Sequence, residues 1–167
     1  MVPALSSMFT SEHLIYEPLD SADEETKAFL YRQLTLDPEI NGMDSINIFS
    51  PPAKSRYFET LTHWKDNLLS YYSRTEHEQS LRGVPIGVVG LSPVHAIHQH
   101  LRSTQLGISI GSKHQGKGYG SEALQWLANW AVGYANIHAL RLQTGSMNVK
   151  AINVYKKVGF VEDRARS

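Results

Sequence analysis

The feature that most constrains the fold of this chain is a glycine-rich stretch between an expected strand and an expected helix. It reads Gln115-Gly-Lys-Gly-Tyr-Gly120 and follows the apolar run 106–110, while apolar residues recur at helical spacing over 121–134. In such a loop, backbone N–H groups at the start of a helix converge on one point, and the helix dipole adds positive potential. The sequence therefore predicts a phosphate or pyrophosphate site; a plain strand-to-helix turn is the alternative.

Two nucleotide-binding motifs compete for the same residues. The segment from Gly111 to Lys117 fits a P-loop as far as its lysine, but Gly118 stands where a hydroxyl should hold Mg²⁺. The dinucleotide fingerprint fails as well, because Ser121 stands at its third glycine. A nucleotide-binding protein of the P-loop type stays as the weaker alternative.

The wider pattern predicts one α/β domain over residues 1–167, with strands and helices alternating in its C-terminal half. Polar residues over 76–82 favour a hairpin loop there, and Asn-Gly and Pro-Pro mark a loop over 41–52. We expect strands at 13–18, 85–91, 106–110, 138–144 and from 160 onward, and helices from 21 to about 36 and over 57–69, 121–134 and 148–158.

Local signals support the ends of these helices. Ser21 with Glu24 resembles a capping box, and Asn148 can cap the last helix. Gly159 stands where a left-handed C-terminal cap is expected. The last helix gains its apolar stripe from Ala151, Ile152, Tyr155 and Val158.

Composition excludes several classes of protein. Lys plus Arg and Asp plus Glu both count 16, so charge gives no case for nucleic acid or an anionic membrane. The chain has 0 Cys, which excludes disulfides, Cys-ligated zinc and a Cys nucleophile. Neither a signal peptide nor a long apolar span is recognisable. We therefore expect a soluble, cytoplasmic protein.

Two separate blocks resemble the GNAT superfamily of N-acetyltransferases. Gln115, Gly118 and Gly120 form its Gln-x-x-Gly-x-Gly acetyl-CoA motif, and the pattern Asn148-x-x-Ala151-x-x-x-Tyr155-x-x-x-Gly159-Phe160 is similar to its other cofactor-side motif. The blocks occur in the family's order and spacing. The run Gly118–Ala123 looks most like the branch that includes ribosomal-protein N-terminal acetyltransferases.

The resemblance implies a GNAT-like α/β fold, with a mixed, mostly antiparallel central sheet, a splayed strand pair and helices on both faces. It implies acetyl-CoA as cosubstrate and direct attack by a primary amine in a ternary complex. The acceptor would be a protein N-terminus, a polyamine or an amino sugar. Tyr155 would protonate the departing thiolate. By the same resemblance, the cofactor would be bound by Ile108, Ser109, Ile110, Gln115, Gly116, Lys117, Gly118, Tyr119, Gly120, Ser121 and Asn148.

The sequence departs from the family's pattern in two places. Gln105 stands where many relatives carry a glutamate base, and His100, Glu76, Glu78 or a water chain are open substitutes. Only seven residues follow Phe160, so we expect the family's last strand to be missing. An uncovered fifth strand suggests a homodimer. The alternative is a catalytically weakened module that still binds CoA.

A cluster formed by His95, His98 and His100 could suggest zinc. It contains no acidic residue and lies between two expected strands, so a solvated loop is the better interpretation. We predict no metal site.

Overall fold

The computed structural model describes residues 8–18, 23–29, 31–32, 69–77, 80–92 and 102–163. In this part of the chain the strands are β1 (Leu14–Pro18), β2 (Leu69–His77), β3 (Ser80–Leu91), β4 (Ser103–Ile110) and β5 (Ala139–Arg141). The helices are α2 (Glu24–Phe29), the short 3₁₀ turn η3 (Ser112–His114), α5 (Tyr119–Gly133) and α6 (Val149–Val158).

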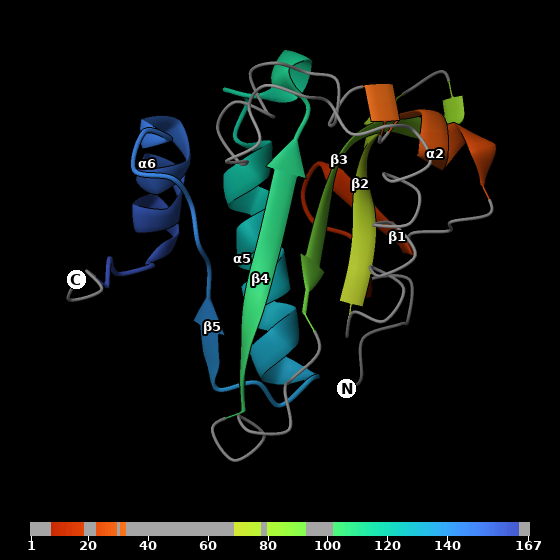
Figure 1. Ribbon diagram of the computed structural model, residues 1–167. Helices are drawn as coiled ribbons and strands as arrows, with labels where there is room; N and C mark the ends of the chain where they lie inside the picture. The colour runs from red at the N-terminus through yellow and green to blue at the C-terminus, as the bar shows by residue number, and fades with distance from the viewer. Residues whose placement is uncertain are drawn as a thin grey trace.

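The strands form one sheet in the order β1-β2-β3-β4-β5 (Figure 1). The first three pairings are antiparallel and the β4–β5 pairing is parallel. Residues 103–105 of β4 pair with 139–141 of β5, whereas residues 106–110 pair with β3 on the other side. The two strands therefore diverge beyond Gln105, which is the splayed pair that the sequence predicted.

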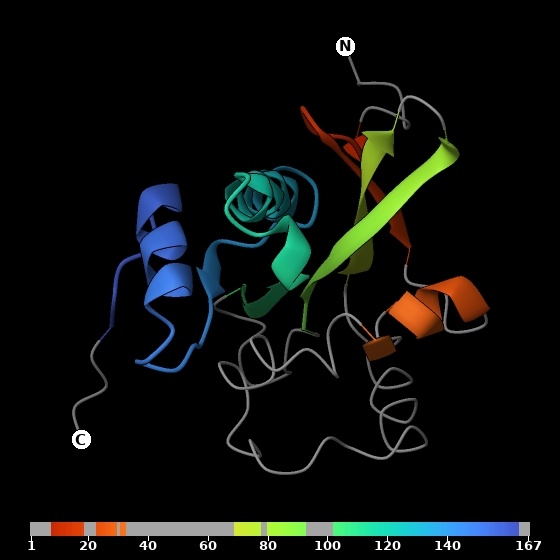
Figure 2. The ribbon, with the colours of Figure 1, turned by 90° about the horizontal axis from the view of Figure 1, so that it is seen from above.

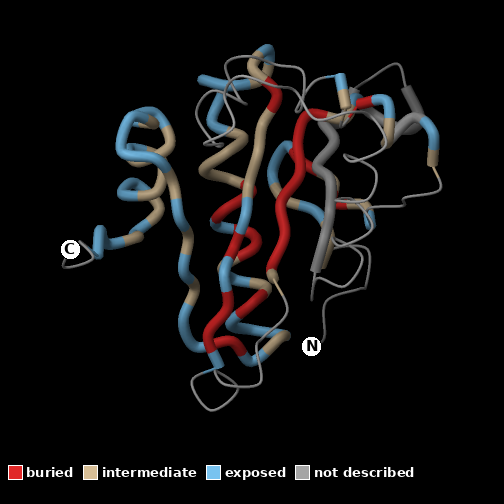
Figure 3. The backbone as a smooth tube through the Cα atoms, viewed as in Figure 1, coloured by how far each residue is buried: buried red, intermediate tan, exposed pale blue. Residues whose placement is uncertain are grey.

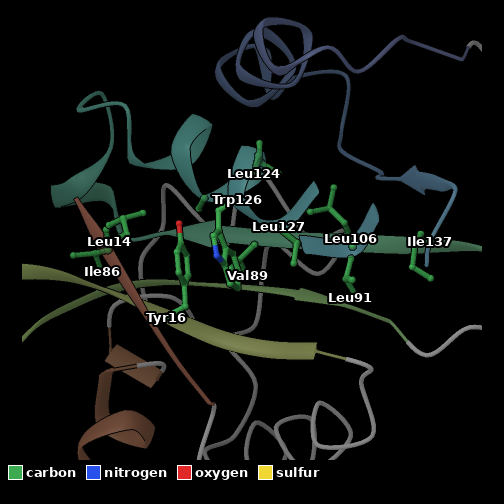
Figure 4. Close-up of a cluster of buried hydrophobic side chains, with 12 residues drawn as sticks. Leu14, Tyr16, Ile86, Val89, Leu91, Leu106, Leu124, Trp126, Leu127 and Ile137 are labelled. Carbon is green, nitrogen blue, oxygen red and sulfur yellow. The ribbon is translucent and has the colours of Figure 1, made fainter. Parts of the chain in front are cut away.

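Helices cover both faces of the sheet. Figure 2 shows α5 on one side and α2 on the other, with α6 beside α5 at the β5 end. The core lies between α5 and the sheet, and burial is concentrated there (Figure 3). Its largest fully buried side chains are those of Leu14, Ile86, Leu91, Leu124, Leu127 and Val89 (Figure 4).

Close contact between β3 and β4 fixes the part of β4 that leaves β5. At Gly87 an added Cβ would lie 2.3 Å from the Ser109 backbone oxygen and 2.7 Å from Ile110 Cδ1. Only a residue without a side chain fits there, since both distances are far below van der Waals contact.

Several expected elements differ from the observed ones. The hairpin predicted at 76–82 has a shorter loop than expected, because His77 of β2 already pairs with Ser80 of β3 and only two residues separate the strands. An antiparallel ladder is made by the backbone, so a polar sequence does not prevent it. The C-terminal boundary predicted for the helix over 57–69 is too late, because Leu69 is already the first residue of β2.

The predicted final strand from Phe160 is wrong in the described residues 160–163, which form neither strand nor helix. The N–H groups of Gly159 and Phe160 both donate to the Tyr155 carbonyl, and Glu162 lies 3.4 Å from Lys156. The chain thus turns back over the end of α6. The strand expected over 138–144 is shorter, since β5 covers only Ala139–Arg141.

Helices α5 and α6 agree with the sequence, and α2 lies inside the helix expected from 21 to about 36, part of which falls outside the described residues. Asn148 Oδ1 accepts a hydrogen bond of 3.2 Å from Ala151 N, and Gly159 has φ 109°, so both caps of α6 are confirmed. The predicted stripe of α6 is only half-buried. The expected Ser21 cap, the loop 41–52, residues 57–68 and the histidine cluster lie outside the described residues.

Candidate active site

A cleft of about 490 Å³ opens where β4 and β5 diverge. One wall is the C-terminal half of β4 with the glycine-rich loop and the start of α5, and the other wall is α6. It is lined by Ile108, Ser109, Ile110, Gln115, Gly116, Gly118, Gly120, Ser121, Leu124, Asn148, Lys150, Ala151, Asn153, Val154, Tyr155 and Lys157. The two blocks that resembled a cofactor site therefore face each other across one cavity.

The β4 wall offers backbone rather than side-chain polarity. Its edge beyond Gln105 is left open by β5, so an extended ligand can hydrogen-bond there in the manner of an added strand. Gln115 Nε2 donates a 2.9 Å hydrogen bond to the Ile110 carbonyl. This bond ties the glycine-rich loop to the end of β4.

The loop has the geometry of an anion site. Gly116 has φ 75° and Gly118 has φ 90°, a left-handed region that favours glycine. Gly118 is also the N-cap of α5 and makes no side-chain cap. The N–H groups of the first turn, which have no acceptor within the helix, are thus left for a ligand.

Two of the predicted loop residues do not line the cleft. Lys117 is exposed, and Tyr119 packs against the core cluster instead. The P-loop interpretation required the lysine to hold the phosphates, so the position of Lys117 argues against it. The other predicted cofactor residues all border the cavity, although their roles stay predictions.

The α6 wall adds two cations that sequence reasoning missed. Lys150 and Lys157 both line the cleft. Their spacing of seven residues places them on one helix face, and this was the signal that could have found them. Tyr155 lines the same wall, and its ring makes an edge-to-face contact with Phe160 at a centroid distance of 6.3 Å.

The charge in the cleft is positive. Its described lining contains the two lysines and no carboxylate. Beside the loop, burial lowers the pKa of His114, and the charges of Lys117 and Lys113 lower it further. The site therefore suits an anion, and a neutral His114 adds no charge of its own near pH 7.

No base is provided by the described lining, which holds neither carboxylate nor imidazole. Gln105 is exposed on β4 opposite Arg141 and lies outside the cleft. Glu76 belongs to β2, of which only the backbone is described, and Glu78 and His100 fall outside the described residues. Among the residues whose positions are given, no group of His, Asp or Glu could hold a metal. None of the described helices is long and apolar enough to cross a membrane.

Known proteins are similar to this chain in sequence and in fold. The chain is 29% identical over 117 residues to the spermidine N(1)-acetyltransferase of Vibrio cholerae; the match covers 65% of this chain and 66% of that enzyme, just under two thirds of its length. The structure is similar to that of spermidine N-acetyltransferase from Vibrio cholerae in complex with CoA and spermine (TM-score 0.69, 24% identity, 92% of this chain and 83% of the other).

A ribosomal-protein acetyltransferase in complex with coenzyme A has the same fold, with a TM-score of 0.67 at 13% identity over 92% of this chain and 82% of the other. The sequence model of the acetyltransferase (GNAT) domain matches residues 13–161, which is most of the chain. The resemblance of the two motif blocks is thereby confirmed, and the chain belongs to the acetyltransferase (GNAT) domain family.

Proposed function

We propose that this chain transfers an acetyl group from acetyl-CoA to a primary amine, and that residues 1–167 act as a single domain. The observation that carries this proposal is the cleft between the splayed strands, which joins an anion-binding helix start to an open strand edge. Acetyl-CoA has matching parts, a diphosphate and an extended pantetheine arm with amide groups. Its thioester supplies the activated acetyl group.

The residues present fit this cofactor. Gly116 and Gly118 keep side chains away from the diphosphate, and the lysines of α6 add charge opposite it. Residues 108–110 would pair with the arm through their backbone, and Asn148 would face it from the start of α6. A Cβ built at Gly120 would find its nearest neighbours at 3.9 and 4.0 Å, so the first turn of α5 has room beside it.

For the chemical step we propose that Tyr155 protonates the departing thiolate. Its side chain borders the cleft on α6, and packing against Phe160 limits its movement. The remaining contribution of the chain is to hold the thioester and the amine together and to keep the amine's path open. The absence of a base from the described lining supports a second candidate, a module that binds CoA with weakened catalysis.

We propose a polyamine of the spermidine class as acceptor. The support is the relative named as a spermidine acetyltransferase, whose identity to this chain is higher than that of the ribosomal-protein enzyme. A protein N-terminus is the alternative. We also propose self-association through β5, which in the described residues pairs only with β4, and a cytoplasmic location, which suits a chain with 0 Cys.

Calorimetric titration with acetyl-CoA, with ATP–Mg²⁺ as control, tests the cofactor. Release of CoA is then followed with spermidine, spermine and a short peptide with a free N-terminus. Turnover with the polyamines alone supports the full proposal, and turnover with the peptide alone replaces the acceptor. Binding without any turnover would favour the weakened module, and no binding of acetyl-CoA would overturn the assignment.

A further inference from the structure

The start of α5 lacks the side-chain hydrogen bond that usually stabilises the N-terminus of a helix. Gly118 supplies no side-chain cap, and a second glycine follows at position 120 within the first turn. Glycine loses more backbone entropy on folding than any other residue, and helix ends fray. A turn built in this way needs support from elsewhere if its N–H groups are to stay aimed at a ligand.

This support comes from Glu122, two residues beyond Gly120. Glu122 is the acidic residue of the first turn of α5, and its side chain is only 17% exposed. Its Oε1 accepts hydrogen bonds from Ser11 Oγ at 2.5 Å and from the His13 backbone N–H at 2.7 Å. Its Oε2 lies 3.1 Å from His13 Nδ1. We call these three residues the N-terminal clasp.

Ser11 and His13, the other half of the clasp, lie in a turn that is closed by its own hydrogen bonds. Ser11 and His13 stand at the tip of a tight turn, closed by hydrogen bonds of 2.8 Å from Ser11 N to the Leu14 carbonyl and from Tyr16 N to the Phe9 carbonyl. Ser11 Oγ also lies 2.9 Å from the Tyr16 hydroxyl. Ser11 is therefore bonded to Leu14 and Tyr16, which both belong to strand β1.

The same turn contacts α5 again one helical turn later. The Tyr16 ring stacks on Trp126 at a centroid distance of 3.6 Å (Figure 4). Trp126 Nε1 donates to the Met8 carbonyl at 2.9 Å. Glu122 and Trp126 are four residues apart and so lie on one face of α5. The helix is thus fixed against the segment before β1 at two successive turns.

The clasp also controls where a negative charge lies. A free carboxylate in the first turn of a helix is attracted to the same N–H groups that an anionic ligand would use. The bonds from Ser11 and His13 hold the Glu122 carboxylate against the N-terminal segment, and Glu122 is not among the residues that line the cleft. The His13 ring also lies beside Tyr119 of the same turn, at a centroid distance of 6.5 Å.

From these contacts we infer that Glu122, held by Ser11 and His13, is a positioning residue for cofactor binding. It keeps the first turn of α5 formed and its N–H groups available to the diphosphate. This inference rests on the proposed function, because it takes acetyl-CoA as the ligand of that turn.

The test compares Glu122→Ala with Glu122→Gln, which keeps an oxygen for Ser11 and the His13 N–H. The affinity for acetyl-CoA, measured by calorimetry, should fall about tenfold in Glu122→Ala and stay within about twofold of wild type in Glu122→Gln, as expected when hydrogen bonds to a charged group are lost or kept. Gln125→Ala, an exposed change on the same helix, is the matched control and should bind as wild type does.

Amide hydrogen exchange of the ligand-free proteins separates positioning from general damage. In Glu122→Ala, exchange at residues 123 and 124, whose N–H groups bond to carbonyls of the first turn, should accelerate while the later turns of α5 keep their wild-type rates. Wild-type affinity of Glu122→Ala would overturn the inference, as would uniform acceleration along α5. Failure of the wild-type protein to bind acetyl-CoA would instead overturn the proposed function.

Discussion

The two helices that border the cleft are built in opposite ways. Helix α5 buries five residues and lies against the sheet, while α6 has no fully buried residue and packs mainly on α5. Their ends differ as well. The N-cap of α5 is a glycine without a side-chain bond, whereas α6 begins at Asn148, whose side chain accepts a bond from its own helix.

Because they are built differently, α5 and α6 contribute different groups to the site. The position of α5 is set by the core, and its unsatisfied first turn suits it to receive an anion. Helix α6 satisfies its own ends and contributes side chains, which include the two lysines and Tyr155. We expect the α5 wall to be preformed and the α6 wall to be more easily displaced.

The largest effect that tests this contrast is a core truncation in each helix. Leu127→Ala on α5 removes a side chain of 0% exposure and should lower the free energy of unfolding by about 2–5 kcal/mol. Val158→Ala on α6 removes a half-buried one and should cost about 1 kcal/mol or less. Urea unfolding measures both values. Equal losses would mean that α6 is as firmly part of the core as α5.

The contrast also explains which parts of the fold the sequence could predict. The length and apolar face of α5 could be predicted because its buried residues recur at helical spacing within one short segment of the sequence. The loop of the β2–β3 hairpin was predicted too long because the pairing depends on backbone contacts across the sheet and not on alternating side chains over 76–82. The turn after Gly159 was mistaken for a strand because Phe160 packs on its own helix.

For the site, the contiguous motif identified the loop but not the direction of its side chains. Lys117 belongs to the motif and still is not part of the cleft lining, whereas Lys150 and Lys157 line the cleft and lie outside the motif's fixed positions. The role of Glu122 was invisible because its partners, Ser11 and His13, lie 111 and 109 residues earlier in the chain. Sequence spacing carries no information on contacts of that range.

A change at the α5 cap should have the next largest effect. Gly118→Ala places a Cβ at φ 90° and should cost about 1–2 kcal/mol of stability, with weaker binding of acetyl-CoA. Gly133→Ala, at the other end of the same helix, meets no atom within 4 Å and should be neutral or stabilise by up to about 1 kcal/mol. Thermal melts and calorimetry measure the two changes. A stable Gly118→Ala with wild-type affinity would remove the special role of the α5 start.

Helix α6 contributes positive charge to the cleft through Lys150 and Lys157. The double change Lys150→Ala and Lys157→Ala should weaken acetyl-CoA binding about tenfold, or about 1.4 kcal/mol, and the loss should shrink in high salt because the interaction is screened. Lys156→Ala is the matched control, since Lys156 pairs with Glu162 and is not part of the cleft wall. Equal losses in the two variants would indicate a general charge effect rather than a site.

The smallest effect is a difference in pH dependence between the two helix starts. The start of α5 is held through the Glu122 carboxylate, which titrates, whereas the start of α6 is capped by the Asn148 amide, which does not. Burial raises the pKa of Glu122, but the hydrogen bonds from Ser11 and His13 and the charge of His13 outweigh it, so the pKa lies below its ordinary value. A carboxyl whose pKa is lowered by folding stabilises the native state above its unfolded pKa of about 4.3, and this contribution is lost as the pH falls through the lowered value. Between pH 7 and pH 3, wild type should therefore lose more stability than Glu122→Gln, whereas Asn148→Ala should cost about 1 kcal/mol at either pH. Denaturant unfolding at both pH values measures these differences. Parallel pH dependence of wild type and Glu122→Gln would show that the tie at α5 is no more electrostatic than the amide cap of α6.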